Sequence, residues 1–305
     1  MPRFAARTLE ALVTLWLLAT LCFVLLRAAP GGPFDSEKAA PPEVEAALAA
    51  TYRLDRPPLA QYGAWLGDVL RGDLGPSFQY PDYTVNELLA ASLPITVTLG
   101  LAALALALLL GVPLGVLAAL RAGRWSDRLL MFAAGLGLAV PKFVAAPLLI
   151  LLFAVSLHWL PAGGWDGGWR GAVLPVLALA LPNLAYCARL TRASLLEVLE
   201  ADWVRAARGR GLGGARLLFV HLLRPALLPV VAWLSPALIN VVSGSAVVEQ
   251  VFGIPGVGRH FVQGALNRDY TLVLGVVLVV GAAIVVINVL VDALRGRMDP
   301  RLGGE

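Results

Sequence analysis

The sequence predicts an all-α integral membrane protein with six transmembrane helices and both termini in the cytoplasm. The chain has 305 residues, of which 59% are hydrophobic and 14% charged, and its mean hydropathy is +0.78. A soluble domain of this size needs more polar surface. The net charge of +4 would also suit a nucleic-acid-binding protein. Here, however, the basic residues cluster between apolar runs, which indicates membrane orientation and no nucleic-acid partner.

Six apolar runs approach the ~20 residues that cross a bilayer. They cover residues 9–26, 93–120, 129–157, 173–188, 226–248 and 272–294. The first run is interpreted as a retained anchor rather than a signal peptide, because no small-x-small cleavage site precedes its Pro-Gly break. Pro175 and Pro182 interrupt the fourth run. Transmembrane helices tolerate prolines where neighbouring groups satisfy the freed carbonyls, so this run is kept as a span.

The runs divide the chain into four parts. These are an N-terminal transmembrane helix (1–29), an extracytoplasmic loop with short helices (30–91), a core of five transmembrane helices that includes the loop 189–224 (92–294), and a cytoplasmic tail (295–305).

Charges in the connections set the orientation. Residues 30–92 carry nine acidic and four basic residues, whereas 189–224 carries seven arginines and three acids. The short connection 121–128 has three arginines and one acid, and the tail adds three more arginines. Positive charge marks the cytoplasmic side, so both termini and the two arginine-rich connections are predicted to lie there.

The long outer loop shows helical spacing of apolar residues in two stretches, 41–54 and 61–75. A third short helix is predicted along the membrane surface at 84–94, with Thr84 and Glu87 in the spacing of a capping box. Its aromatic residues suit the membrane interface. The loop is either a packed cap on the bundle or a docking surface for a soluble partner.

No pattern indicates catalysis, a cofactor or a metal. His158, His221 and His260 are scattered, and no phosphate-binding GxxxxGK[ST] occurs. Cys22 and Cys187 form no CxxC spacing. The chain is therefore not expected to be an enzyme. Lys142 is the main charge within the runs; it either snorkels to an interface or faces neighbouring helices or a cavity.

The stretch EADWVRAARGRGLGGARLLFVHLLR, residues 200–224, is named the basic elbow below. The sequence from 189 onward predicts one amphipathic helix that stops at the glycines 209–214, followed by a second short amphipathic piece. Composition leaves two interpretations open. The elbow is either a hairpin lying on anionic lipid or a knob that presents charge and apolar surface to a protein partner.

The elbow resembles the cytoplasmic loop of ABC importer permeases, whose pattern is Glu-Ala-Ala, three residues, Gly, and a later Leu-Pro. Ala206, Ala207 and Gly211 match that spacing, Leu228-Pro229 follows later than usual, and Arg205 stands where the family has Glu. Other stretches are similar to oligopeptide permease subunits of the B type. They include APGGPFDSE (29–37), YRLDRPPLAQYGAWLGDVLRGDLGPSF (52–78), ARLTRASLLEVL (188–199) and VVEQVFGIPGVGRHFVQGALNRDY (247–270).

This resemblance implies a type I ABC importer permease fold in a bacterial cytoplasmic (inner) membrane. It also implies four kinds of partner: a second homologous permease subunit, two cytoplasmic ATPase subunits, an extracytoplasmic peptide-binding protein and membrane lipid. The substrate would be an oligopeptide, with dipeptides or nickel as alternatives. A secondary carrier driven by an ion gradient is the rival from another class, but no inverted repeat or midplane charge pattern supports it. A membrane scaffold without transport is the third possibility.

The resemblance also assigns site residues. The elbow residues that would couple to an ATPase are Glu200, Asp202, Arg205, Ala206, Ala207, Arg208, Gly209 and Gly211. The polar residues that would line the translocation path are Asn183, Asn240, Ser243, Ser245, Glu249 and Asn288. Intramembrane polar residues are functional candidates, although Asn and Ser also join helices by hydrogen bonds. The turn at 253–259 either shapes the mouth of the path or is a plain connection.

Overall fold

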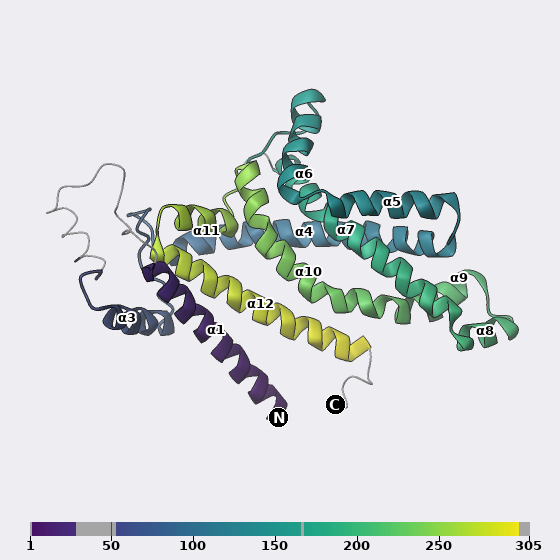
Figure 1. Cartoon of the computed structure of the whole chain (residues 1–305), viewed down its shortest axis with the longest axis horizontal. Coiled ribbons are helices and arrows are strands. Elements are labelled where there is room, and N and C mark those ends of the chain that lie inside the picture. The colour runs from purple at the N-terminus through teal and green to yellow at the C-terminus, as the bar shows by residue number, and fades with distance from the viewer. Residues whose placement is uncertain (1, 29–49, 51–52, 166–167, 299–305) are drawn as a thin grey trace. The chain divides into compact units, whose positions relative to one another are not determined.

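The computed structural model describes residues 2–28, 50, 53–165 and 168–298, and this part of the chain is helical (Figure 1). Its helices are α1 (Pro2–Ala28), α3 (Pro58–Leu70), α4 (Val85–Leu120), α5 (Trp125–Ala139), α6 (Lys142–Leu149), the π-helix η1 (Ile150–Ser156), α7 (Trp169–Glu200), α8 (Asp202–Gly209), α9 (Gly214–Arg216), the π-helix η2 (Leu217–Leu222), α10 (Leu223–Phe252), α11 (Val257–Leu266) and α12 (Tyr270–Met298). Most of the predicted helix 41–54 and the last residues of the tail lie outside the described residues.

The chain forms two compact units. The outer unit consists of Met1–Ile95 and Pro255–Val285, and the core unit consists of Thr96–Ile254 and Val286–Glu305.

Five described helical segments are long and apolar enough to cross a membrane, which agrees with the predicted membrane class. They are Leu9–Ala28, Val85–Leu120, Trp169–Glu200, Gly214–Phe252 and Tyr270–Val291. The sixth predicted span, 129–157, is not one straight helix: Trp125–Ala139 and Lys142–Ser156 meet at a bend of 102°. The proline at 141 explains the bend, because it keeps Val140 extended (ψ 114°) and ends α5.

The fourth predicted span is continuous and longer than expected. Pro175 and Pro182 lie inside α7, which runs to Glu200 before Ala201 turns extended with ψ 142°. The prediction of a single helix from 189 to 209 is therefore wrong, because this break separates α7 from α8. The short amphipathic piece after the glycines is also not separate, because α9 and η2 continue directly into α10.

The start of α4 shows why no separate helix runs along the surface at 84–94. The Thr84 amide donates to Glu87 Oε2 at 2.8 Å, and the Glu87 amide donates to Thr84 Oγ1 at 3.3 Å. This reciprocal capping box was predicted and is confirmed. It begins α4 at Val85, which is fully buried in the core of the outer unit with Leu272 and Val276.

In the core unit, α7 packs beside α5 and α10 (Figure 1). Its other close neighbour is α4, where glycines allow the backbones to approach. A Cβ at Gly115 would lie 2.5 Å from the Ala188 carbonyl oxygen, and one at Gly111 would lie 2.9 Å from Cys187 Cβ. Small residues at such spacing drive helix association in membranes, since lipid gives apolar side chains no reason to prefer each other.

Candidate functional site

The basic elbow begins with the short helix α8, which has a buried face and an exposed face. Val204 is fully buried and Ala207 is 5% exposed, and both belong to a cluster with residues of α4, α7 and the start of α10. The opposite face is open to solvent. Its exposed residues are Asp202, Trp203, Arg205, Ala206, Arg208 and Gly209. One face therefore fixes α8 to the core unit while the other stays available.

The end of α8 is set by Gly211, whose φ is +85°. The Gly211 amide donates to the Arg208 carbonyl at 2.9 Å, and the Leu212 amide donates to the Ala207 carbonyl at 3.1 Å. These two bonds form a Schellman motif, which requires a left-handed residue at this position. A side chain at Gly211 would meet no atom within 4 Å. The glycine is thus needed for backbone conformation rather than for space.

The charged residues of α8 are placed where they interact favourably with the helix dipole. Asp202 lies in the first turn and Arg208 in the last, which is the favourable arrangement. Arg205 approaches Asp202 at 3.4 Å, but these side chains are 72% and 96% exposed, so the pair contributes little to stability. The arginines keep their hydrogen-bonding capacity for another surface.

The eight predicted coupling residues include both exposed and buried positions. Glu200 ends α7 and is exposed, as are five residues of α8 and Gly211, whereas Ala207 packs inside the core unit. Ala207 therefore positions the helix in this chain. The buried anchor Val204, which the motif does not include, was missed by the prediction.

A partly buried ion pair joins α5 and α7. Arg192 donates from Nε to Asp127 Oδ1 at 2.6 Å and from Nη2 to Oδ2 at 2.7 Å, and Asp127 is 3% exposed. Asp127 Oδ2 also accepts the Gly123 amide at 2.9 Å. In the sequence these residues are recognisable only as charges of the connecting segments. The bidentate pair fixes the connection 121–128 against α7.

The predicted path residues do not form one cluster. Asn183 is buried and donates to the Leu179 carbonyl of its own helix at 2.8 Å. Ser245 likewise bonds the Val242 carbonyl at 2.8 Å. Asn288 accepts a hydrogen bond from Ser235. The side chain of Ser243 lies outside the described part.

Glu249 and Asn240 have partners on other helices. Thr96 of α4 donates to Glu249 Oε1 at 2.8 Å, and Glu249 is fully buried. Lys142, the first residue of α6, donates to Asn240 Oδ1 at 2.9 Å and to its carbonyl at 3.2 Å. Lys142 therefore faces a neighbouring helix, which resolves the alternatives left open by the sequence. Thr96 was missed because a lone threonine in an apolar run gives no signal.

The outer unit is organised around Asp269, which is fully buried. Its Oδ2 accepts hydrogen bonds from Ser77 Oγ at 2.5 Å and from the Phe78 and Gln79 amides at 3.0 and 3.1 Å. Its Oδ1 accepts from Thr271 Oγ1 and the Leu272 amide, both at 3.0 Å. Asp269 thus caps α12 and holds the 76–80 loop against it.

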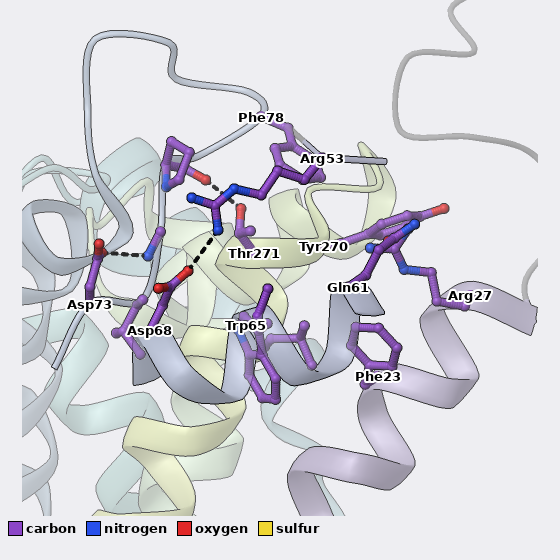
Figure 2. Close-up of a pocket in the computed structure, with 15 residues that line it drawn as sticks. Phe23, Arg27, Arg53, Gln61, Trp65, Asp68, Asp73, Phe78, Tyr270 and Thr271 are labelled. Carbon is purple, nitrogen blue, oxygen red and sulfur yellow. Dashed lines mark hydrogen bonds and ion pairs between the residues drawn. The ribbon is translucent and has the colours of Figure 1, made fainter. Parts of the chain in front are cut away.

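The outer unit also contains a cavity of about 230 Å³ (Figure 2). The Arg27 guanidinium lies 5.2 Å from the Phe23 ring centroid and 5.0 Å from that of Tyr270, a double cation–π contact. On another wall Arg53 bonds Asp68 at 3.2 Å. The lining carries no arrangement of nucleophile and base. Several of the expected interfacial aromatics pack within the unit, as Phe78 does against Tyr270 at 6.1 Å, whereas Tyr83 is 55% exposed.

The remaining titratable groups give no sign of a catalytic or metal centre in the described residues. No group of three potential metal ligands occurs there. His260 of α11 meets the Tyr80 ring edge-on at 6.0 Å, and burial lowers the pKa of its imidazole, with a smaller contribution from Arg259. A half-buried histidine with a lowered pKa, packed against an aromatic ring, is a packing residue.

Comparison with known proteins gives the family. Residues 111–304 match the family described as "Binding-protein-dependent transport system inner membrane component". The chain is 48% identical to the "Oligopeptide transport system permease protein OppB" of Salmonella typhimurium and 47% identical to that of Escherichia coli (strain K12), over 97% of both chains in each case. It is 38% identical to the "Dipeptide transport system permease protein DppB" of Bacillus subtilis, over 99% of this chain and 98% of the relative.

A solved structure shows the same fold. The MetNI methionine ABC transporter, in an inward facing conformation, matches 70% of this chain and 96% of its own with a TM-score of 0.54 and 20% identity. The predicted all-α ABC importer permease fold is thereby confirmed. The chain belongs to the family of binding-protein-dependent transport system inner membrane components.

Proposed function

We propose that this chain is the transmembrane permease subunit of an ATP-driven importer for oligopeptides in a bacterial inner membrane. The observation that carries the proposal is the 47–48% identity to oligopeptide permease proteins over 97% of both chains. The dipeptide permease is less similar, at 38%. The chain forms half of the translocation path, and a second, homologous permease subunit forms the other half. An extracytoplasmic binding protein delivers the peptide.

The basic elbow couples this subunit to a cytoplasmic ATPase. The anchored face of α8 makes the helix a rigid lever, because Val204 and Ala207 tie it to α4, α7 and α10. The open face offers Arg205 and Arg208 to acidic groups of the ATPase, with the exposed Ala206 allowing close approach. Movement of the ATPase dimer then moves the spans as rigid bodies.

The first experiment is reconstitution of this chain with its second permease, its ATPases and its binding protein in liposomes. Oligopeptides should stimulate ATP hydrolysis and accumulate inside. Dipeptides and Ni²⁺ serve as the two competing substrates. Stimulation by either of them without stimulation by oligopeptides would move the chain to another branch of the family.

Coupling is tested with Gly211→Val and its matched control Gly213→Val. A side chain at either position meets no atom within 4 Å, but only Gly211 has a positive φ, whereas Gly213 has φ −154°. Gly211→Val should lower peptide-stimulated ATP hydrolysis about tenfold, because the αL conformation disfavours a β-branched residue by at least ~1 kcal/mol. Gly213→Val should remain near wild type. Unchanged uptake in the Gly211 variant refutes a coupling role for this turn.

The side of the membrane is tested by thiol labelling. Trp203 is 45% exposed on α8, so a cysteine placed there is reachable. In a background without Cys22 and Cys187, an impermeant maleimide should label Trp203→Cys only in inverted vesicles. Labelling in intact cells would place the elbow outside and exclude the ATPase as its partner.

A further inference from the structure

The lysine at the bend between α5 and α6 is a charge that no carboxylate in the described part of the core unit neutralises. Lys142 is half-buried, and its ammonium donates to two acceptors that both belong to Asn240 and are both uncharged. Among the described residues no carboxylate lies within ion-pair distance of it. An ammonium has three N–H donors, so at least one remains available.

The partner of this ammonium, Asn240, lies within the apolar helical segment Gly214–Phe252. Asn240 precedes the outer end of α10, Phe252, by twelve residues, which is ~18 Å along a helix. Asn240 therefore lies well away from both ends of this 39-residue segment. The two hydrogen bonds to Asn240 hold the charge of Lys142 beside it.

An ammonium among apolar membrane-spanning helices is costly unless an anion joins it or it faces a water-filled path. The bend supplies the means of placing it there. Since α5 ends at Ala139 and Pro141 keeps the chain extended, Lys142 begins a new helix in a different direction, with its side chain toward α10. A straight third span would have lacked this reorientation.

We propose that Lys142 binds the C-terminal carboxylate of the transported peptide, with Asn240 positioning the ammonium. The inference rests on the proposed function, because it takes a peptide as the substrate. Peptides of any sequence share one obligatory anion, their C-terminal carboxylate. A single fixed cation in the path therefore suits a permease that passes many sequences, since it recognises the group they have in common. Ammonium–carboxylate hydrogen bonds are among the stronger ones available.

The test compares two peptides in the reconstituted importer: a peptide with a free C-terminal carboxylate and the same peptide as its C-terminal amide. The isolated binding protein is titrated with both, and transport rates are normalised to its occupancy. The wild type should transport the free acid about tenfold faster than the amide, because a hydrogen bond to a charged group is worth roughly this factor or more.

Three variants and one control variant test whether Lys142 causes the preference for the free acid. Lys142→Met should lower transport of the free acid about tenfold and leave the amide unchanged, while Lys142→Arg should keep the preference. Asn240→Asp supplies an internal counter-ion for the lysine and should also remove the preference selectively. Arg121→Met makes the same charge change at an exposed position of a connecting loop and should leave the preference intact.

Each outcome is decisive. If neither peptide is transported by the wild type, the proposed function fails. If both are transported without preference, or if Lys142→Met slows both equally, the lysine has a structural role or pairs with a carboxylate of the second permease, and the inference is wrong. If Lys142→Met fails to assemble, Asn240→Asp decides: a retained acid preference overturns the inference.

Discussion

The outer unit and the basic elbow differ in the burial and hydrogen bonding of their charged side chains. The carboxylate of Asp269 is fully buried and accepts hydrogen bonds from five donors of two segments. Arg205 on the elbow is 72% exposed and has one contact at 3.4 Å. All these hydrogen bonds of Asp269 are made within the chain and stabilise the fold. The guanidinium of Arg205 still has N–H donors that a partner surface can bind.

Removing the satisfied charge should have the largest effect. Asp269→Ala leaves several buried donors without acceptors and should destabilise the chain by ~4 kcal/mol, since each unsatisfied group costs roughly 1–3 kcal/mol. Arg205→Ala should change stability by less than ~0.5 kcal/mol. Thermal unfolding in detergent measures both. Similar losses of stability in the two variants would show that the two regions do not differ in this way.

Close backbone packing of α4 against α7 contributes to holding the core unit together, and a glycine substitution tests this contribution. In Gly115→Val the new side chain meets the Ala188 carbonyl and Thr191 Cβ, at 2.5 and 2.6 Å from Cβ. We expect a loss of ~3 kcal/mol from overpacking. Gly135→Val, on α5, meets no atom within 4 Å and should be tolerated. A folded, fully stable Gly115 variant would show that α4 and α7 do not need this contact.

A smaller effect is expected at the start of α4. Thr84→Ala removes the side-chain half of the capping box and should cost ~1 kcal/mol, and Thr84→Ser should restore most of it. Unfolding by denaturant in mixed micelles measures the difference. If the alanine variant is as stable as the wild type, packing of Val85 alone begins the helix.

The smallest effect concerns pH. Burial lowers the pKa of His260 in the folded chain below 6.5. As pH falls below ~6.5 the unfolded chain therefore binds a proton before the folded chain does, so stability decreases until the folded pKa is passed. His260→Phe should remove this part of the pH dependence, by less than ~1 kcal/mol. An identical pH profile in both proteins would mean that His260 is not shielded as described.

The sequence alone determined the membrane class, the capping box at Thr84 and the family motif at Ala206, Ala207 and Gly211. These features are local: hydropathy, charge and turn chemistry act over a few residues and leave a direct pattern. The φ of +85° at Gly211 is the conformation that a helix-ending glycine predicts.

Tertiary structure decided which side chains meet. It set the bend at Pro141 and the break at Ala201. It also paired Lys142 with Asn240 and joined Asp269 to residues about 190 positions away. A periodic pattern does not encode such pairs, because a polar residue in an apolar run reads the same whether it bonds its own helix, as Asn183 does, or another one. Only the packing of the helices distinguishes the two, since burial forces each polar group to take whichever partner the fold brings within reach.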